Sequence, residues 1–346
     1  MKQPPCSPDM YLGADISTFD HDHGTCYCMG SDSYVKESLR IVEAIMIQEG
    51  VRFRTGGKIP QNPFTSLKYR AELDLSEECS IDQLTIYQHL VGILRWIIEL
   101  GRVNIHIEVS ILSRYLASPR VGHLHQALHI FHYLQYHKRS KMALNPTPID
   151  WQDDDCISIE ETPRYKAARM KELYPDAKED IPPNMPEPLG EPMQINTFVD
   201  SDHANDRITR RSQSGIIIFI GKAPIQWYSK RQNCVESASF GSEFVALRIA
   251  TELIKSLRYK MRMFGMPLDG PVNMFCDNQS VVTNTSTPES VLRKKHNSIA
   301  YHLVREAVAA SITLVRKVLS LHNTADLFTK SLPANQRKSH TQAITV

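Results

Sequence analysis

The sequence lacks any long stretch of apolar residues. Among its 346 residues there is no run of about 18 or more uncharged apolar residues, the length that a membrane-spanning helix needs. The most apolar stretch, residues 91–100, contains Arg95 and Glu99. The N-terminus, MKQPPCSPDM, also lacks the apolar segment of a signal peptide. These absences argue against a membrane partner, and we expect an intracellular protein, in the cytoplasm or the nucleus.

Cysteine is scarce, and its number is odd. Seven cysteines are scattered from Cys6 to Cys276, which fits reduced thiols better than a disulfide framework. A nucleotide-binding P-loop is also missing, because GKAPIQ, residues 221–226, departs from the required G-x-x-x-x-G-K-[ST] pattern. The sequence therefore predicts neither a secreted disulfide-rich protein nor a P-loop enzyme.

The composition is that of a globular protein with an uneven charge. Hydrophobic residues make up 42% and charged residues 23%, and the length suggests two domains rather than one. Residues 191–346 hold 20 Lys and Arg against 12 Asp and Glu, a net charge of +8. Residues 1–190 hold 20 against 26, a net charge of −6. A polyanion is therefore expected to bind the second half.

Proline marks a boundary between the two halves. Nine of the 20 prolines fall in residues 144–193, which also contain the acidic run WQDDDCISIEE. Proline removes backbone donors and neighbouring acids repel one another. We therefore predict that residues 144–193 form a linker without a packed core.

The segment before this linker is expected to be mainly helical. Val35, Leu39, Val42 and Met46 are spaced by 3 and 4 residues and would form one apolar helix face. Similar patterns predict further helices, and two short stretches before them, MYLGADIST and GTCYCMG, predict a β-hairpin. The further helices are expected at about residues 80–100, 105–116 and 123–136.

The segment after the linker has an α/β pattern. INTFVD, GIIIFIG and APIQWYSKRQ predict three strands, and the apolar spacing from Phe244 to Met261 predicts a long helix. VNMFCD and ITLVRKVLSL predict two more strands, with two helices between them, and TADLFTKSL predicts a final helix. The expected order is βββαβααβα.

Four acidic residues stand at the ends of these elements. Asp200 ends the first strand, Glu243 lies in the first turn of the long helix, Asp277 ends the fourth strand and Asp326 begins the final helix. Strand ends and helix N-termini share one edge of an α/β sheet, where sites form. Singly, each acid is more often a turn residue or a partner of the helix dipole. Together, in this order, they favour a common site.

Converging carboxylates need a counter-ion. Like charges raise one another's pKa, so four acids cannot all stay ionised in apolar surroundings without one. Two Mg²⁺ ions, roughly 3.5–4 Å apart, can neutralise such a set and hold both the attacking water and the leaving oxygen of a phosphodiester. Magnesium prefers oxygen ligands. The set therefore predicts a two-Mg²⁺ site, in which Mn²⁺ is expected to be able to substitute.

These residues resemble a known family. The segment from FVDSDHANDRITRRSQSG to SFGSEFVAL, followed by MFCDNQSVVTNTSTPES, KKHNSIAYHLVREAV and TADLFTKSL, resembles the ribonuclease H domain of Ty1/copia-type retrotransposon Pol polyproteins. The resemblance spans most of residues 195–333. It implies a ribonuclease H-like five-stranded mixed sheet with helices, two Mg²⁺ ions, and an RNA–DNA hybrid as substrate.

The resemblance also implies residue roles. By motif, the catalytic and metal-binding acids are Asp200, Glu243, Asp277 and Asp326, while Asp202 is expected to be a loop or supporting acid. Gln279, two residues after the third acid, resembles a hybrid-contacting position. His322 lies where related enzymes carry a histidine, although only four residues separate it from Asp326. Further substrate contacts are expected from Arg211, in the basic run RITRRSQS, while His296 is expected to be structural or to contact a phosphate.

The first half resembles the same polyprotein just upstream of its ribonuclease H domain. The stretch from YQHLVGILRWIIELG to IFHYLQYHKR resembles the thumb and connection of copia-type reverse transcriptases. The Y-x-D-D turn that would hold the polymerase metals is absent, because the only run of aspartates, Asp153 to Asp155, follows Gln152. No reverse transcriptase activity is therefore expected. Other parts of the retroelement polyprotein are possible partners.

The predicted organisation has four parts: a thumb and connection remnant in residues 1–143, a linker in 144–193, a ribonuclease H-like domain in 194–335 and a tail in 336–346. The predicted function is Mg²⁺-dependent cleavage of the RNA strand of RNA–DNA hybrids within a truncated copia-type polyprotein. Two alternatives stay open at this point. One is a catalytically silent, nucleic-acid-binding remnant, and the other is a DDE-type integrase, which shares the sheet.

Overall fold

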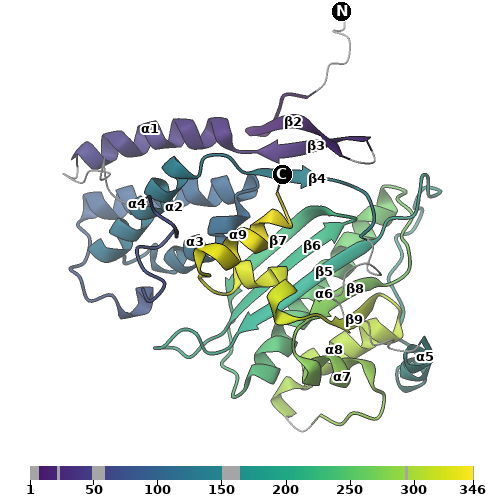
Figure 1. Cartoon of the computed structure of the whole chain (residues 1–346). Helices are drawn as coiled ribbons and strands as arrows, with labels where there is room; N and C mark the ends of the chain where they lie inside the picture. The colour runs from purple at the N-terminus through teal and green to yellow at the C-terminus, as the bar shows by residue number, and fades with distance from the viewer. Residues whose placement is uncertain (1–7, 22–23, 49–58, 150–163, 293–294, 346) are drawn as a thin grey trace, which may run out of the picture. The chain divides into compact units, whose positions relative to one another are not determined.

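The computed structural model describes residues 8–21, 24–48, 59–149, 164–292 and 295–345. Two compact units make up the chain (Figure 1). The first unit combines residues 1–145 with residues 331–346, and the second unit consists of residues 146–330. The first unit is therefore built from two separate segments of the chain.

A small antiparallel sheet and a group of helices form the first unit. Its strands lie in the order β1 (Met10–Tyr11), β2 (Ala14–His21), β3 (Gly24–Gly30) and β4 (Lys141–Leu144). The predicted hairpin is confirmed, since β2 and β3 pair from Asp15 with Gly30 to His21 with Gly24. The helices are α1 (Asp32–Gln48), α2 (Ile81–Glu99), α3 (His106–Leu112), α4 (Val121–Tyr136) and α9 (Ala334–Gln342), with short 3-10 turns at Ala71–Leu73, Val103–Ile105 and Ser113–Tyr115.

The predicted helices of this unit are present. The α1 residues chosen from their spacing are all buried, with Val35 and Val42 fully so. α2 starts where Ser80 accepts a hydrogen bond from the Gln83 backbone, while the Gln83 side chain accepts one from the Ser80 backbone. This reciprocal cap satisfies two backbone donors at the helix start. Local sequence therefore determines these helices and their buried faces.

The second unit contains a five-stranded mixed sheet. Its order is β7 (Ala223–Arg231), β6 (Gln213–Ile220), β5 (Ile195–Asp202), β8 (Val272–Cys276) and β9 (Thr313–Lys317). β5, β6 and β7 pair antiparallel, and β8 runs parallel to both β5 and β9. The predicted α/β class, with a five-stranded mixed sheet after a mainly helical segment, is confirmed.

Apolar strands and one helix face build the core of this unit. Ile216, Ile217 and Ile218 of β6 are fully buried, because β-branched side chains pack well on a pleated, covered surface. α6 (Ser239–Met263) packs against β5 and β6, and α8 (Ser298–Ala309) packs against α6 (Figure 1). The remaining helices are α5 (Arg164–Leu173) and α7 (Gln279–Ser286), with 3-10 turns at Lys295–Asn297 and Ser320–His322.

The predicted final helix at TADLFTKSL is wrong in type. Residues Thr324–Phe328 form a short 3-10 helix instead. Asn323 caps it by accepting a hydrogen bond from the Ala325 backbone and also donates to the Val199 carbonyl of β5 at 3.0 Å. The segment is therefore fixed against the sheet by polar contacts, which an apolar spacing pattern does not report.

The predicted linker is not free of packing. Its described part includes α5, where Met170 is fully buried in the core of the second unit. Glu179 bridges Arg258 and Arg262 of α6, each at 2.7 Å. Burial alone would raise the pKa of Glu179, but its bonds to the two arginines hold that pKa below its ordinary value. Proline-rich composition argued against a packed core here, but it did not exclude a helix or docking onto a neighbouring surface.

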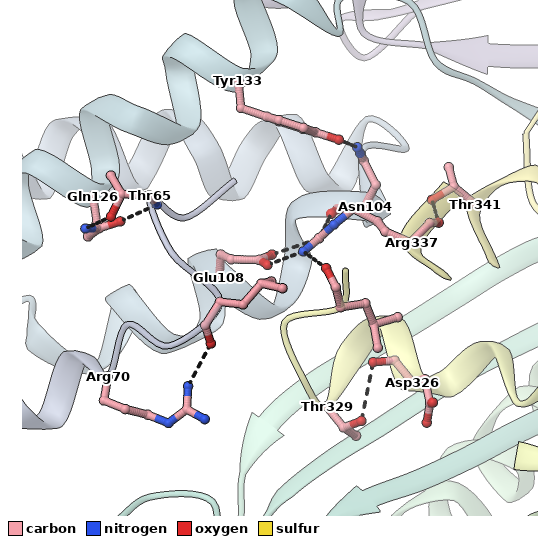
Figure 2. A network of polar contacts seen from close by, with 12 residues as sticks. Thr65, Arg70, Asn104, Glu108, Gln126, Tyr133, Asp326, Thr329, Arg337 and Thr341 are labelled. Carbon is pink, nitrogen blue, oxygen red and sulfur yellow. Dashed lines mark hydrogen bonds and ion pairs between the residues drawn. The ribbon is translucent and has the colours of Figure 1, made fainter. Parts of the chain in front are cut away.

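The predicted tail, residues 336–346, is also not a tail. α9 contributes Arg337 to the interior of the first unit, where its side chain is 4% exposed. Arg337 donates to Glu108 Oε1 at 2.6 Å and to the Asn104 carbonyl at 2.6 Å (Figure 2). Ile344, after α9, is buried as well. The C-terminal segment is thus part of the first unit, whereas the thumb and connection assignment of residues 1–143 stays a prediction.

The Arg337–Glu108 pair yields a stability prediction. Replacing Arg337 with Met leaves Glu108 as an unpaired buried charge, which costs about 3–5 kcal/mol. Hydrogen exchange of the α4 amides, read by mass spectrometry, should speed up strongly in Arg337→Met. Arg40→Met, which breaks an exposed pair with Glu37, should change it little. Equal exchange in the two variants would contradict the role given to this pair.

Candidate active site

Two neighbouring strands deliver the first and third acids. Asp200 lies near the end of β5 and Asp277 directly follows β8. β5 and β8 are parallel and pair Val199 with Cys276, so both carboxylates emerge at the same edge of the sheet. Asp200 is 4% exposed. The backbone pairing of β5 with β8 therefore places these two carboxylates side by side without the help of side-chain contacts.

The second acid comes from the long helix that covers the sheet. Glu243 lies just past the first turn of α6, rather than within it as predicted, and is 5% exposed. α6 packs against β5, which brings Glu243 over the strand that carries Asp200. Atoms of Asp200, Glu243 and Asp277 lie within 4.8 Å of one another. The structure thus brings together three of the four predicted acids.

The surroundings of Glu243 disfavour its ionised form. Burial raises the pKa of Glu243 well above its ordinary value, and the charges of Asp200 and Asp277 raise it further. Its Oε2 atom is buried and has no hydrogen-bond partner among the described residues. A buried carboxylate oxygen without a partner costs free energy unless it binds something. Three carboxylates that each offer one oxygen, with these oxygens within 4.8 Å of one another, fit a divalent metal of the Mg²⁺ type.

The fourth acid occupies a different position. Asp326, in the 3-10 helix Thr324–Phe328, is buried, but it does not belong to the three-acid cluster. Lys330 pairs with Asp326 Oδ1 at 2.9 Å and approaches Asp200 Oδ2 at 3.9 Å. Burial, with the charge of Asp200, raises the pKa of Asp326. Asp326 therefore borders the site through Asp200, with a lysine between the two carboxylates.

A glycine permits this close approach. A Cβ atom on Gly215 of β6 would lie 2.6 Å from Thr329 Cγ2 and 2.7 Å from the Ala325 carbonyl oxygen. Gly215 pairs with Asp200 across the sheet, so the chain around Asp326 crosses the sheet directly beside Asp200. Thr329 also donates a hydrogen bond to Asp200 Oδ2. The small residue at 215 is thus required for the fourth acid to reach the site.

The other predicted residues lie outside the acid cluster. Gln279 is exposed at the start of α7 and donates to Thr283 at 3.4 Å. His322 is exposed in the turn before Asn323, and Arg211 is half-buried just before β6. Their roles toward a substrate stay predictions. Asp202 points to the same strand face as Asp200, but it is not one of the three converging acids.

His296 has a clear structural partner. Its Nε2 atom lies 3.0 Å from Glu236 Oε2, and Glu236 is buried.

The site residues that the sequence reasoning missed are Thr329 and Lys330. Lys330 could have been found, because it follows Asp326 by four residues, a spacing at which opposite charges commonly pair on a helical turn. Nothing in the local sequence indicates that Thr329 bonds to Asp200.

Comparison with known proteins gives the chain relatives. No protein-family model matches it. It is 31% identical over 145 residues to the retrovirus-related Pol polyprotein from transposon TNT 1-94 of Nicotiana tabacum, and 28% identical over 143 residues to that from transposon RE1 of Arabidopsis thaliana. Each match covers 41% of this chain. The predicted resemblance to copia-type Pol polyproteins is confirmed.

The chain spans only about a tenth of these Pol polyproteins, 11% and 10% of their lengths. A longer share is matched in the putative transposon Ty5-1 protein YCL074W of Saccharomyces cerevisiae. That match is 24% identical over 174 residues and covers 50% of this chain and 42% of that protein.

Solved structures of ribonucleases H are also among the similar proteins. LC11-RNase H1, isolated from compost, is 17% identical with a TM-score of 0.31, over 39% of this chain and 92% of that chain. RNase H1 from Halobacterium salinarum NRC-1 is 14% identical with a TM-score of 0.30, over 39% of this chain and 94% of that chain.

Among the described residues, no helix combines the length and the apolar character needed to cross a membrane.

The raised pKa of Glu243 predicts a pH-dependent response to metal. Because this pKa is higher in the folded than in the unfolded chain, the metal-free protein should lose stability as the pH rises from the ordinary carboxyl range toward the raised value. A divalent ion binds only the ionised carboxylate and offsets this loss. The melting temperature should therefore rise more with Mg²⁺ at about pH 8 than at about pH 5, by an amount equivalent to roughly 1–3 kcal/mol.

Two variants make this prediction specific. Glu243→Gln should stabilise the metal-free protein at the higher pH and remove most of the Mg²⁺ effect. Glu252→Gln, at an exposed position on the same helix, should change neither the metal-free stability nor the response to Mg²⁺. An equal Mg²⁺ response in wild type and Glu243→Gln would show that Glu243 does not bind the ion.

Proposed function

We propose that the second unit is a Mg²⁺-dependent ribonuclease H that hydrolyses the RNA strand of RNA–DNA hybrids. The observation that carries this proposal is the convergence of Asp200, Glu243 and Asp277 within 4.8 Å, with a buried oxygen of Glu243 left without a partner. The relationship to retrotransposon Pol polyproteins supports it. One of the similar solved structures is LC11-RNase H1 in complex with an RNA/DNA hybrid.

The three converging acids would hold the metal, with Asp326 completing the set on the Asp200 side. Bound Mg²⁺ supplies Lewis-acid stabilisation of the phosphoryl oxygens and makes a water more acidic. The chain's own residues fix the geometry: β5 and β8 align two carboxylates, and α6 places the third above them. Thr329 orients Asp200 by donating to its Oδ2 atom. Because these groups are positioned before substrate binds, little reorganisation is needed during the reaction.

The substrate is proposed from the net charge of the part of the sequence that contains the four acids. Residues 191–346 carry the chain's excess of positive charge, and phosphate contacts from Lys and Arg supply binding that does not depend on base sequence. Discrimination of a hybrid from double-stranded DNA would come from groove shape and contacts to 2′-hydroxyl groups. Gln279 and Arg211 are proposed for substrate contacts of this kind, and His322 is proposed to lie near the substrate.

The test is cleavage of a hybrid whose RNA strand is labelled, with the full chain and Mg²⁺. Wild type should release RNA fragments, and Asp277→Asn should lower the rate at least about 100-fold, because a metal ligand contributes several kcal/mol to the transition state. Asp269→Asn, at an exposed position before β8, is the matched control and should retain the rate. Omission of the metal should reduce cleavage as strongly as Asp277→Asn does.

Other outcomes would assign a different function. If wild type cleaves no faster than Asp277→Asn, the ribonuclease proposal is wrong. Hybrid binding without cleavage would identify a silent nucleic-acid-binding remnant. Strand transfer on DNA without hybrid cleavage would instead identify an integrase-like enzyme.

A further inference from the structure

Lys330 introduces a cation into the site that is proposed to hold metal ions. Its Nζ atom lies 2.9 Å from Asp326 Oδ1 and 3.9 Å from Asp200 Oδ2. The two carboxylates are almost fully buried, with side chains 10% and 5% exposed, whereas the lysine side chain is 42% exposed. The buried acids therefore share a cation that reaches them from the solvent side.

The ammonium group of Lys330 is the positive charge that pairs with these two acids in the described parts of the chain. Among the ion pairs of the described parts of the chain, no other cation pairs with Asp200 or Asp326. Asp200 also accepts from Thr329 through the same oxygen, Oδ2. Without Lys330, Asp200 and Asp326 would face each other as two like charges in a buried environment, which is unfavourable.

A metal ion on this side of the site would use the same atoms. Asp200 and Asp326 would hold such an ion through their carboxylate oxygens, and Lys330 approaches one oxygen of each, Asp200 Oδ2 and Asp326 Oδ1. Asp326 lies outside the cluster of the other three acids while it is paired with Lys330. The lysine and a second ion therefore compete for one position.

We propose that Lys330 is a positioning residue that acts as the resident cation of the second metal position. It holds Asp200 and Asp326 in place before that ion binds, and its ammonium withdraws toward solvent when the ion enters. The half-exposed, flexible side chain allows this movement, because a lysine stem has four rotatable carbons and its head group is readily hydrated. This inference rests on the proposed function, since it concerns the same metal site, and it predicts two ions of unequal affinity.

The experiment is a calorimetric titration of the metal-free full chain with Mg²⁺, together with its melting temperature without metal. Lys330→Met removes the competitor, so the weaker Mg²⁺ site should bind roughly two- to tenfold tighter, as expected for a partly exposed charge. Its metal-free melting temperature should fall, because two buried acids lose their counter-ion. Lys330→Gln, which keeps a polar side chain, should show the same two changes and guards against a folding defect of the first variant.

Two further variants separate this role from general effects. Lys330→Arg keeps the positive charge and should resemble wild type in Mg²⁺ affinity. Lys255→Met removes the same charge from an exposed position on α6. Position 255 lies 12 residues beyond Glu243, about 18 Å along the helix. Lys255→Met should leave the Mg²⁺ affinity of the weaker site unchanged. A purely structural lysine could lower the melting temperature, but its removal would not tighten Mg²⁺ binding.

The outcomes distinguish this inference from the proposed function. Unchanged or weakened Mg²⁺ binding in both Lys330→Met and Lys330→Gln overturns it, as does the absence of detectable Mg²⁺ binding in wild type and variants alike. Tighter Mg²⁺ binding without any hybrid cleavage by wild type would retain the role of Lys330 and reject the ribonuclease. Hybrid cleavage by wild type, with no change in Mg²⁺ binding in the Lys330 variants, would retain the ribonuclease and reject the role of Lys330.

Discussion

Repulsion between converging carboxylates is the constraint on which the second unit depends. Asp200, Glu243 and Asp277 are held within 4.8 Å of one another, although burial and like charges make the ionised form of Glu243 costly. The sheet and helix that hold them must therefore be stable enough to tolerate the cost. The fully buried isoleucines of β6 and the apolar face of α6 supply that stability next to the site. Stability is thus supplied by the core and partly given up at the site, as is common where a protein positions charge for chemistry.

Much of the site could be predicted from the sequence, because its parts lie at the ends of strongly patterned elements. The apolar run before Asp200, the spacing from Phe244 to Met261 and the short strand before Asp277 each predict their element locally, and the strand order then brings the carboxylates together. Asp326 was found as a residue, but its 3-10 environment was not. That environment depends on Asn323 bonding to the Val199 carbonyl and on space left by Gly215, contacts between residues far apart in sequence.

The misplaced boundaries have the same physical origin. Composition predicted a linker, because proline and polar residues do not form an apolar face of their own, and residues 336–346 were predicted as a tail beyond the ribonuclease H-like domain. Glu179, however, docks through two arginines of α6, and Arg337 docks through Glu108 and the Asn104 carbonyl (Figure 2). Such docking depends on single charged residues meeting partners supplied by another element. The spacing of residues along the chain indicates which face of an element is apolar, but it does not indicate which carboxylate, distant in sequence, will pair with an arginine.

The division of the first unit into two segments has a consequence for how the chain folds during synthesis. Residues 146–330 leave the ribosome as a continuous piece, so the second unit can fold while the chain is still being made. The first unit cannot be completed until α9 has been made, because α9 follows the second unit in the chain and supplies Arg337, the partner of Glu108. Residues 1–145 are therefore made before the second unit, but the unit to which they belong is completed only after it.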